Sequence, residues 1–221
     1  SFACASAEDA ERAICAARRA LNEPDWRDLT QTQRGKLLYR LADLIEENAA
    51  HLGKIETTDS GKLSTETANQ AAYDGDNYRY YAPGPMLEFA RVIEAAGFPP
   101  GVVSVITGDA KNCSIPLTRH PDVDRIAFTG GPDTARHVVR NSAENFAVTT
   151  LELGGKSPII VFDDADLDGA ANGLIAGNFG ASGQSCVAGS RGLVHRSILD
   201  VLIKKIEDKM KDVSIGDPLS S

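Results

Sequence analysis

The 221-residue sequence has few of the residues that build metal sites or disulfide frameworks. Its four histidines include no HxxxH pair, and its four cysteines include no CxxC pair. These residues are His51, His120, His137, His195, Cys4, Cys15, Cys113 and Cys186. Their spacing argues against structural zinc and against a disulfide-stapled fold. We therefore expect reduced thiols, no bound metal and a cytoplasmic location.

The sequence also lacks a basic excess and a long hydrophobic run. It has 23 basic and 31 acidic residues, a net charge of −8, which is a poor match to a nucleic-acid surface. No apolar run approaches the roughly 20 residues of a membrane span. The first residues, SFACASAEDAERAI, carry acids early instead of the apolar core of a signal peptide. We expect neither nucleic acid nor a membrane as a partner.

The middle of the chain alternates between strand and helix patterns. Short β-branched or apolar runs at 102–106, 125–130 and 147–153 predict strands, and helical patterns separate them. This order predicts an α/β fold with a doubly wound parallel sheet.

Helical patterns precede this region, and a different order of strands and helices follows it. Residues 6–21 and a second stretch from Thr30 predict helices, with Ser6 as N-cap and Asp9 at the capping-box position. After residue 157 come a short strand, PIIVF, an acid-capped helix, a strand, GLVH, and an amphipathic helix. We place a domain boundary after Leu151, which gives domains at 1–151 and 152–221.

The segment AFTGGPDTA ends a predicted strand in Gly130 and Gly131 and begins a helix at Pro132. Free N–H groups and the helix dipole at such a junction attract anions, and glycine lets a phosphate approach the backbone. The alternative is a plain tight turn, because the segment is not a GxGxxG motif.

Two further segments carry reactive side chains. Glu152 in LELGGKSP stands between leucines at a strand end, where partial burial would raise a carboxyl pKa and favour a general base. The alternative is a surface glutamate before a turn. Cys186 in GASGQSCVAGSR is surrounded by small residues, which leave space for a substrate around a nucleophilic thiol. The alternative is a buried, inert cysteine.

Together these segments resemble the aldehyde dehydrogenase family. LELGGKSP is similar to its glutamate motif and GQSCVAGSR to its cysteine motif, and the separation of 34 positions from Glu152 to Cys186 matches that of the family. The segments GFPPGVVSVITG, HPDVDRIAFTGG and IIVFDDADLD resemble other family segments in the family's order. The resemblance covers nearly the whole chain. It implies a Rossmann-like cofactor domain followed by part of an α/β catalytic domain.

The resemblance also implies a mechanism. Cys186 would attack an aldehyde carbonyl as a thiolate, and its backbone N–H would be one oxyanion donor. Hydride transfer to NAD or NADP would leave a thioester, which Glu152 would hydrolyse by activating water. The cofactor would contact Thr129, Gly130, Gly131, Thr134 and Leu153, with Leu153 towards the nicotinamide. The family is homo-oligomeric.

The sequence departs from the family pattern at two places. The segment NYRYYA joins directly to PGPMLEFA, without the intervening Pro-Trp-Asn and Lys-Pro segments that supply a second oxyanion donor and a ribose contact. After IGDPLSS the chain lacks the Glu-x-Phe-Gly-Pro segment and the oligomerisation strand. In FTGG, Gly131 stands where many members have serine. We therefore expect a shortened member of the family, and an inactive relative with an interaction role is the alternative. A third hypothesis is a thiol-dependent esterase.

Overall fold

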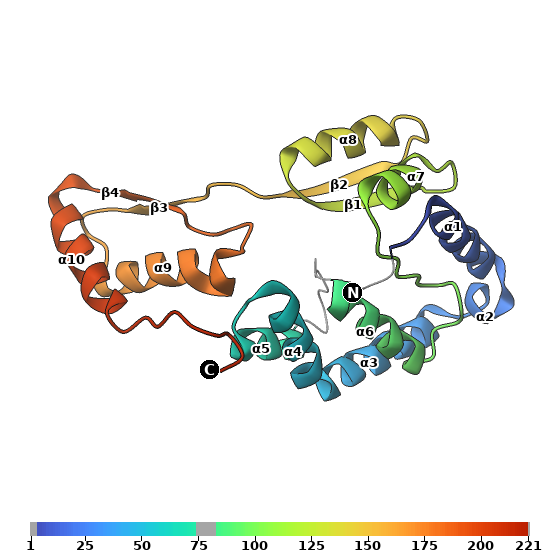
Figure 1. The fold of residues 1–221 in the computed structure, drawn as a ribbon, viewed down its shortest axis with the longest axis horizontal. Coiled ribbons are helices and arrows are strands. Elements are labelled where there is room, and N and C mark those ends of the chain that lie inside the picture. The colour runs from blue at the N-terminus through green and yellow to red at the C-terminus, as the bar shows by residue number, and fades with distance from the viewer. Residues whose placement is uncertain (1–3, 74–82, 221) are drawn as a thin grey trace.

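The computed structural model describes residues 4–73 and 83–220 of the chain (Figure 1). Within these ranges, six helices come first. They are α1 (Ala7–Asn22), α2 (Pro24–Arg27), α3 (Gln31–Glu47), α4 (Ala49–Ser60), α5 (Ser64–Tyr73) and α6 (Pro83–Ala95). The capping box predicted for the first helix is confirmed, because Ser6 and Asp9 exchange side-chain and backbone hydrogen bonds. Thr30 caps α3 in the same way with Gln33.

The largest hydrophobic core joins α3, α4, α5 and α6. Leucine, isoleucine, valine, alanine and one phenylalanine make up its buried members. They are Leu44, Ile45, Ala49, Leu52, Ala71, Phe89, Val92, Ile93 and Ala96. Gly53 lets α4 approach α5 closely, since a Cβ there would lie 2.6 Å from the backbone nitrogen of Ala68. The helices thus form a packed unit of their own.

The second unit is a parallel strand pair covered by a helix. After η2 (Ala110–Ser114) and α7 (Ile115–Arg119), strand β1 (Arg125–Gly130) leads into α8 (Pro132–Ser142) and β2 (Val148–Leu153). The strands pair in register from Arg125 opposite Val148 to Gly130 opposite Leu153. Ile126, Val138 and Ala147 form the core beneath α8.

The prediction of a strand at residues 102–106 is wrong. This segment has irregular backbone, and Val103 is 46% exposed. Strand backbone needs a neighbouring strand to take its hydrogen bonds. In the part of the chain that the structure describes, β1 pairs only with β2. The β-branched composition of the segment therefore did not produce a strand.

The third unit is a second parallel pair. It contains β3 (Pro158–Val161), α9 (Leu167–Phe179), η3 (Gly180–Gly183), β4 (Arg191–Val194), η4 (Arg196–Ile198) and α10 (Leu199–Met210). Pro158 lies opposite Arg191, and Val161, Ala171 and Leu202 form the core between the strands and the two helices. The α/β class is confirmed, but the described strands form two separate pairs.

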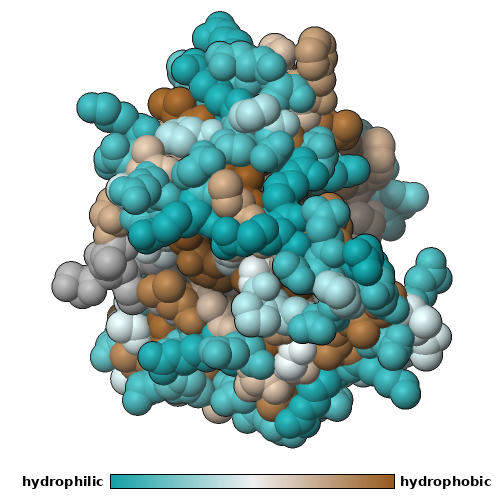
Figure 2. Space-filling view, turned by 90° about the vertical axis from the view of Figure 1, so that its right-hand side faces the viewer, coloured by the Kyte–Doolittle hydropathy of each residue, from teal (hydrophilic) through white to brown (hydrophobic). Residues whose placement is uncertain are grey.

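The three units are loosely arranged. In Figure 1 the helices α3–α6 lie below, β1 and β2 lie to one side, and β3 and β4 lie to the other, with extended chain joining β2 to β3. The exposed area is 14143 Å², whereas a compact monomer of 23.5 kDa exposes about 9,800 Å². Figure 2 shows a mostly hydrophilic face with hydrophobic residues in a hollow between its upper and lower parts. Among the described residues no helix is long and apolar enough to cross a membrane.

An ion pair ties α9 to α10 and predicts a pH effect on stability. Lys205 Nζ lies 2.9 Å from both carboxylate oxygens of Asp168, and this bond, more than the nearby charge of Lys209, lowers the pKa of Asp168 below its usual 3.8. A carboxyl with a depressed folded-state pKa stabilises the fold above about pH 4 and loses that contribution as the pH falls further.

We expect Asp168→Asn to lower the unfolding temperature at about pH 6 and to reduce the drop in unfolding temperature between about pH 6 and about pH 3. Circular dichroism at both pH values measures this difference. An equal drop in both proteins would contradict a stabilising role for the pair.

Candidate active site

The glycine turn between β1 and α8 is open on one side. Gly131 is the N-cap of α8 with an extended backbone, and a Cβ built there meets no atom within 4 Å. No side chain caps this helix end. The first N–H groups of a helix lack intrahelical acceptors. The N–H groups of Asp133 and Thr134 can therefore donate to an external anion. Gly130 differs, because a Cβ there would lie 2.6 Å from the ring of Phe128.

Strand pairing places the glutamate motif beside this turn. Thr129 lies opposite Glu152, and Gly130 lies opposite Leu153. The N–H of Gly154 also donates to the carbonyl of Gly130, at 3.2 Å. Ligands of open α/β sheets bind at the carboxyl ends of the strands. Two motifs that are 23 residues apart in the sequence, counted from Thr129 to Glu152, therefore meet at the edge where a ligand is expected.

The expected partial burial of Glu152 is wrong, because its side chain is exposed. A strand in the middle of a covered sheet would bury its end, but β2 has only β1 as a neighbour among the described strands. This exposure removes the burial argument for a general base. The position of Glu152 beside the glycine turn is unaffected.

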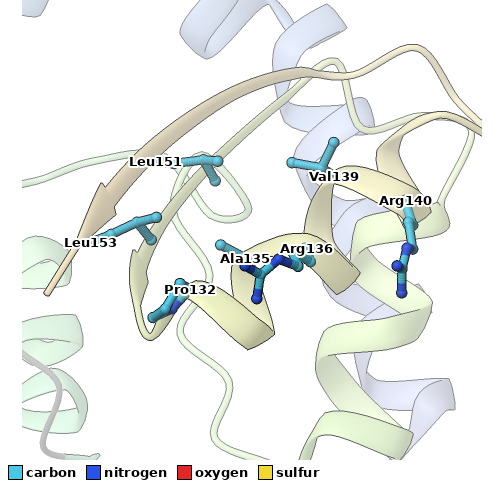
Figure 3. A pocket seen from close by; sticks show the side chains of 7 residues that line it. All are labelled: Pro132, Ala135, Arg136, Val139, Arg140, Leu151 and Leu153. Carbon is cyan, nitrogen blue, oxygen red and sulfur yellow. The ribbon is translucent and has the colours of Figure 1, made fainter.

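A pocket of about 410 Å³ lies between α8 and β2 (Figure 3). Its lining combines apolar side chains with two arginines. They are Pro132, Ala135, Arg136, Val139, Arg140, Leu151 and Leu153. In Figure 3 the side chains of Leu151 and Leu153 extend from the strand towards the helix. The volume is within the range of small-molecule sites.

Sequence reasoning named Leu153 for this region but missed the two arginines. They lie four residues apart on α8, on the same side as Pro132, and this helical spacing was the available signal. Arg136 forms an ion pair with Asp133 in the same helix. Guanidinium groups are well suited to bind carboxylate and phosphate groups.

Cys186 lies in the turn between η3 and β4, and its side chain is exposed. The alternative of a buried thiol is therefore wrong. The turn is anchored on both sides, since Ala188 N donates to Ser185 O at 3.2 Å and Gly189 N donates to Gly177 O at 2.9 Å. Gly189 lies close to Ile159, since a Cβ there would lie 2.2 Å from the Cδ1 atom of Ile159 and would force that side chain to move. Within the described residues, the N–H of Cys186 donates no hydrogen bond.

The segment before Cys186 has an unusual backbone. Ala181, Ser182 and Gly183 have φ values of 52°, 55° and 76°, all left-handed. Each non-glycine residue in this region costs roughly 1–2 kcal/mol. Contacts with the ends of α4 and α5 stabilise this segment, and nothing in the local sequence pattern indicated them.

The candidate residues therefore come from two strand pairs. Thr129, Gly130, Gly131, Glu152 and Leu153 meet at one end of β1 and β2, and Thr134 follows in the first turn of α8. Cys186 belongs to the β3–β4 unit. The described residues include no group of three or more His, Cys, Asp or Glu side chains that could hold a metal ion.

The sequence model of the Aldehyde dehydrogenase family matches this chain twice, at residues 1–86 and 81–221. The chain belongs to the aldehyde dehydrogenase family. The two matches overlap at residues 81–86. This is the point at which the family's Pro-Trp-Asn and Lys-Pro segments are absent from the sequence. This agrees with an internally shortened member of the family.

Curated relatives in this family support the same conclusion. The chain is 41% identical to the (Z)-2-((N-methylformamido)methylene)-5-hydroxybutyrolactone dehydrogenase of Acinetobacter baylyi over 279 aligned positions, covering 97% of this chain and 57% of that protein. It is 31% identical to the betaine aldehyde dehydrogenase of Rhizobium johnstonii, covering 95% and 56%. The chain thus spans a little over half the length of these relatives.

Solved structures of aldehyde dehydrogenases share the fold. A betaine aldehyde dehydrogenase from Staphylococcus aureus, in complex with NAD+ and with a BME-modified cysteine, superimposes with a TM-score of 0.90 at 28% identity over 99% of this chain and 57% of that one. An E. coli NADP-dependent enzyme gives a TM-score of 0.91 at 28% identity, covering 97% and 58%.

Proposed function

We propose that the protein oxidises an aldehyde to a carboxylic acid with NAD or NADP, using Cys186 as nucleophile and Glu152 as general base. The observation that carries the proposal is the exposed Cys186 in an anchored turn, with a backbone N–H that donates no hydrogen bond among the described residues. A thiol open to solvent can meet an aldehyde, and a free N–H can stabilise the oxygen that becomes negative.

The chemistry balances with the protein's own groups as nucleophile and base and with the oxidised cofactor as the hydride acceptor. The Cys186 thiolate attacks the carbonyl carbon, forming a C–S bond, and the carbonyl oxygen becomes an oxyanion near the Cys186 N–H. The cofactor, when bound, accepts the hydride that leaves this carbon, and a thioester remains on Cys186. Glu152 takes a proton from water, the resulting hydroxide attacks the thioester, and the acid leaves as the thiolate is restored.

The residues of the β1–β2 edge fit the cofactor. The open Gly131 and the uncapped start of α8 suit its pyrophosphate, with Thr129, Gly130 and Thr134 around it. Leu153 lines the neighbouring pocket, whose arginines suit further phosphate charge. In this proposal residues 1–151 hold the cofactor together with Leu153, and residues 152–221 supply the cysteine. Relatives crystallised with NAD+ or described as NADP-dependent support the same cofactor class.

A relative without turnover is the second candidate, favoured by the missing Pro-Trp-Asn and Lys-Pro segments. The test is NADH or NADPH absorbance when the purified chain meets a short aldehyde and the oxidised cofactor. Cofactor reduction supports the proposal. No turnover and no cofactor-dependent thermal shift support the inactive relative, whereas ester hydrolysis without cofactor reduction supports a thiol esterase.

A further inference from the structure

The corner between α4 and α5, residues 60–66, contacts residues 181–184, the segment that leads to Cys186. Glu66 Oε2 accepts a hydrogen bond from the N–H of Ala181 at 3.1 Å, across 115 residues of sequence. Ser182 Oγ donates to the carbonyl of Gly61 at 3.0 Å, and Gln184 Nε2 donates to the carbonyl of Ser60 at 2.9 Å. Three bonds therefore join this corner to three of the five residues just before Cys186.

These contacts act on the residues with left-handed backbone. Ala181 and Ser182 are the non-glycine residues of the strained turn, and both are bonded to the corner. Such a backbone persists only where surrounding contacts hold it. The direction of the chain at Cys186 depends on this turn, so the corner contributes to where the thiol lies.

Contacts within α4, α5 and the residues that join them stabilise the corner. Gly61 ends α4 in a left-handed conformation with φ 74°, and Glu56, only 3% exposed, forms a 2.9 Å ion pair with Lys62. Thr57 and Thr67 share a buried hydrogen bond of 2.8 Å between α4 and α5. The carbonyl groups of Gly61 and Ser60, which accept hydrogen bonds from Ser182 and Gln184, thus lie in a region stabilised by its own internal contacts.

We propose that Glu66 is a positioning residue for Cys186: it holds the left-handed turn at Ala181 and Ser182 and so fixes the loop that carries the nucleophile. The role of Cys186 as nucleophile rests on the proposed function, whereas the hydrogen bond from Ala181 to Glu66 that positions the loop is a property of the fold. Glu66 acts through its hydrogen bond with the backbone N–H of Ala181.

Hydrogen exchange of the Ala181 amide directly tests whether Glu66 stabilises the turn. We expect Glu66→Ala to speed exchange of this amide at least tenfold, and alkylation of Cys186 by iodoacetamide, followed on its peptide by mass spectrometry, to speed at least threefold as the loop loosens. Glu66→Gln keeps an oxygen acceptor and is expected to restore both rates to within about threefold of the parent. Thr65→Ala, the exposed neighbour on α5, is the matched control and is expected to change neither.

Exchange in α4 and α5 separates positioning from unfolding. If the amides of these helices keep their protection in Glu66→Ala while Ala181 loses it, the effect is local. Unchanged exchange at Ala181, or equal loss of protection through α4, α5 and the loop, would overturn the proposal. If this hold is confirmed but Cys186→Ala leaves turnover intact, the proposed function fails while the structural role of Glu66 stands.

Discussion

Replacing Cys186 with alanine is expected to reduce aldehyde-dependent cofactor reduction below detection. The thiol is the only group in the proposed mechanism that bonds to the substrate, and loss of a catalytic nucleophile costs a factor on the order of 10⁶ in turnover. The exposed turn is expected to tolerate the smaller side chain, because among the described residues the Cys186 sulfur forms no bond that holds the turn. We therefore expect the unfolding temperature to change little.

Cys4→Ala is the matched control. Cys4 is also an exposed free cysteine, but it precedes α1 and has no place in the proposed chemistry. Its removal is expected to leave cofactor reduction unchanged. Equal rates in Cys186→Ala and the parent would contradict the nucleophile assignment, and equal losses in the two variants would indicate a general thiol effect.

Glu152→Gln is expected to separate the two halves of the reaction. Glutamine cannot take a proton from water, so hydrolysis of the thioester slows by about 10²–10⁴-fold, the usual contribution of a general base. Attack by Cys186 and hydride transfer do not need this carboxylate. Rapid mixing is therefore expected to show a burst of reduced cofactor close to one per chain, followed by slow turnover.

A glutamate elsewhere on the surface provides the comparison. Glu207 lies exposed on α10, and Glu207→Gln changes the same charge without touching the candidate site. We expect its burst and steady-state rates to match the parent. Loss of the burst together with turnover in Glu152→Gln would show that the carboxylate acts before hydrolysis or supports the fold.

The local signals of the sequence were sufficient for much of the fold. The strand at Arg125–Gly130, the cap at Ser6 and the start of a helix near Thr30 agree with the structure, because each depends on residues within a few positions. The meeting of the FTGG turn with Glu152 was also accessible, since parallel strands align their carboxyl ends. The order of strand, helix and strand is enough to infer this meeting, although we did not predict it from the sequence.

Other features depended on distant partners. The β-branched segment 102–106 has a strand-like composition but no neighbouring strand among the described residues, and Glu152 is exposed because β2 belongs to a pair. The bond from Ala181 to Glu66 spans 115 residues. No local pattern reports such a contact, so the support beneath the cysteine loop appeared only in the structure.

The most direct measurement traps the covalent intermediate on the protein. The Glu152→Gln chain is mixed with a short aldehyde and oxidised cofactor, quenched in acid, digested and analysed by mass spectrometry. We predict that the peptide containing Cys186 gains the mass of the acyl group, only when the cofactor is present, while those containing Cys4, Cys15 and Cys113 do not. An unmodified Cys186 peptide after cofactor reduction, or an acyl group on another cysteine, would contradict the account.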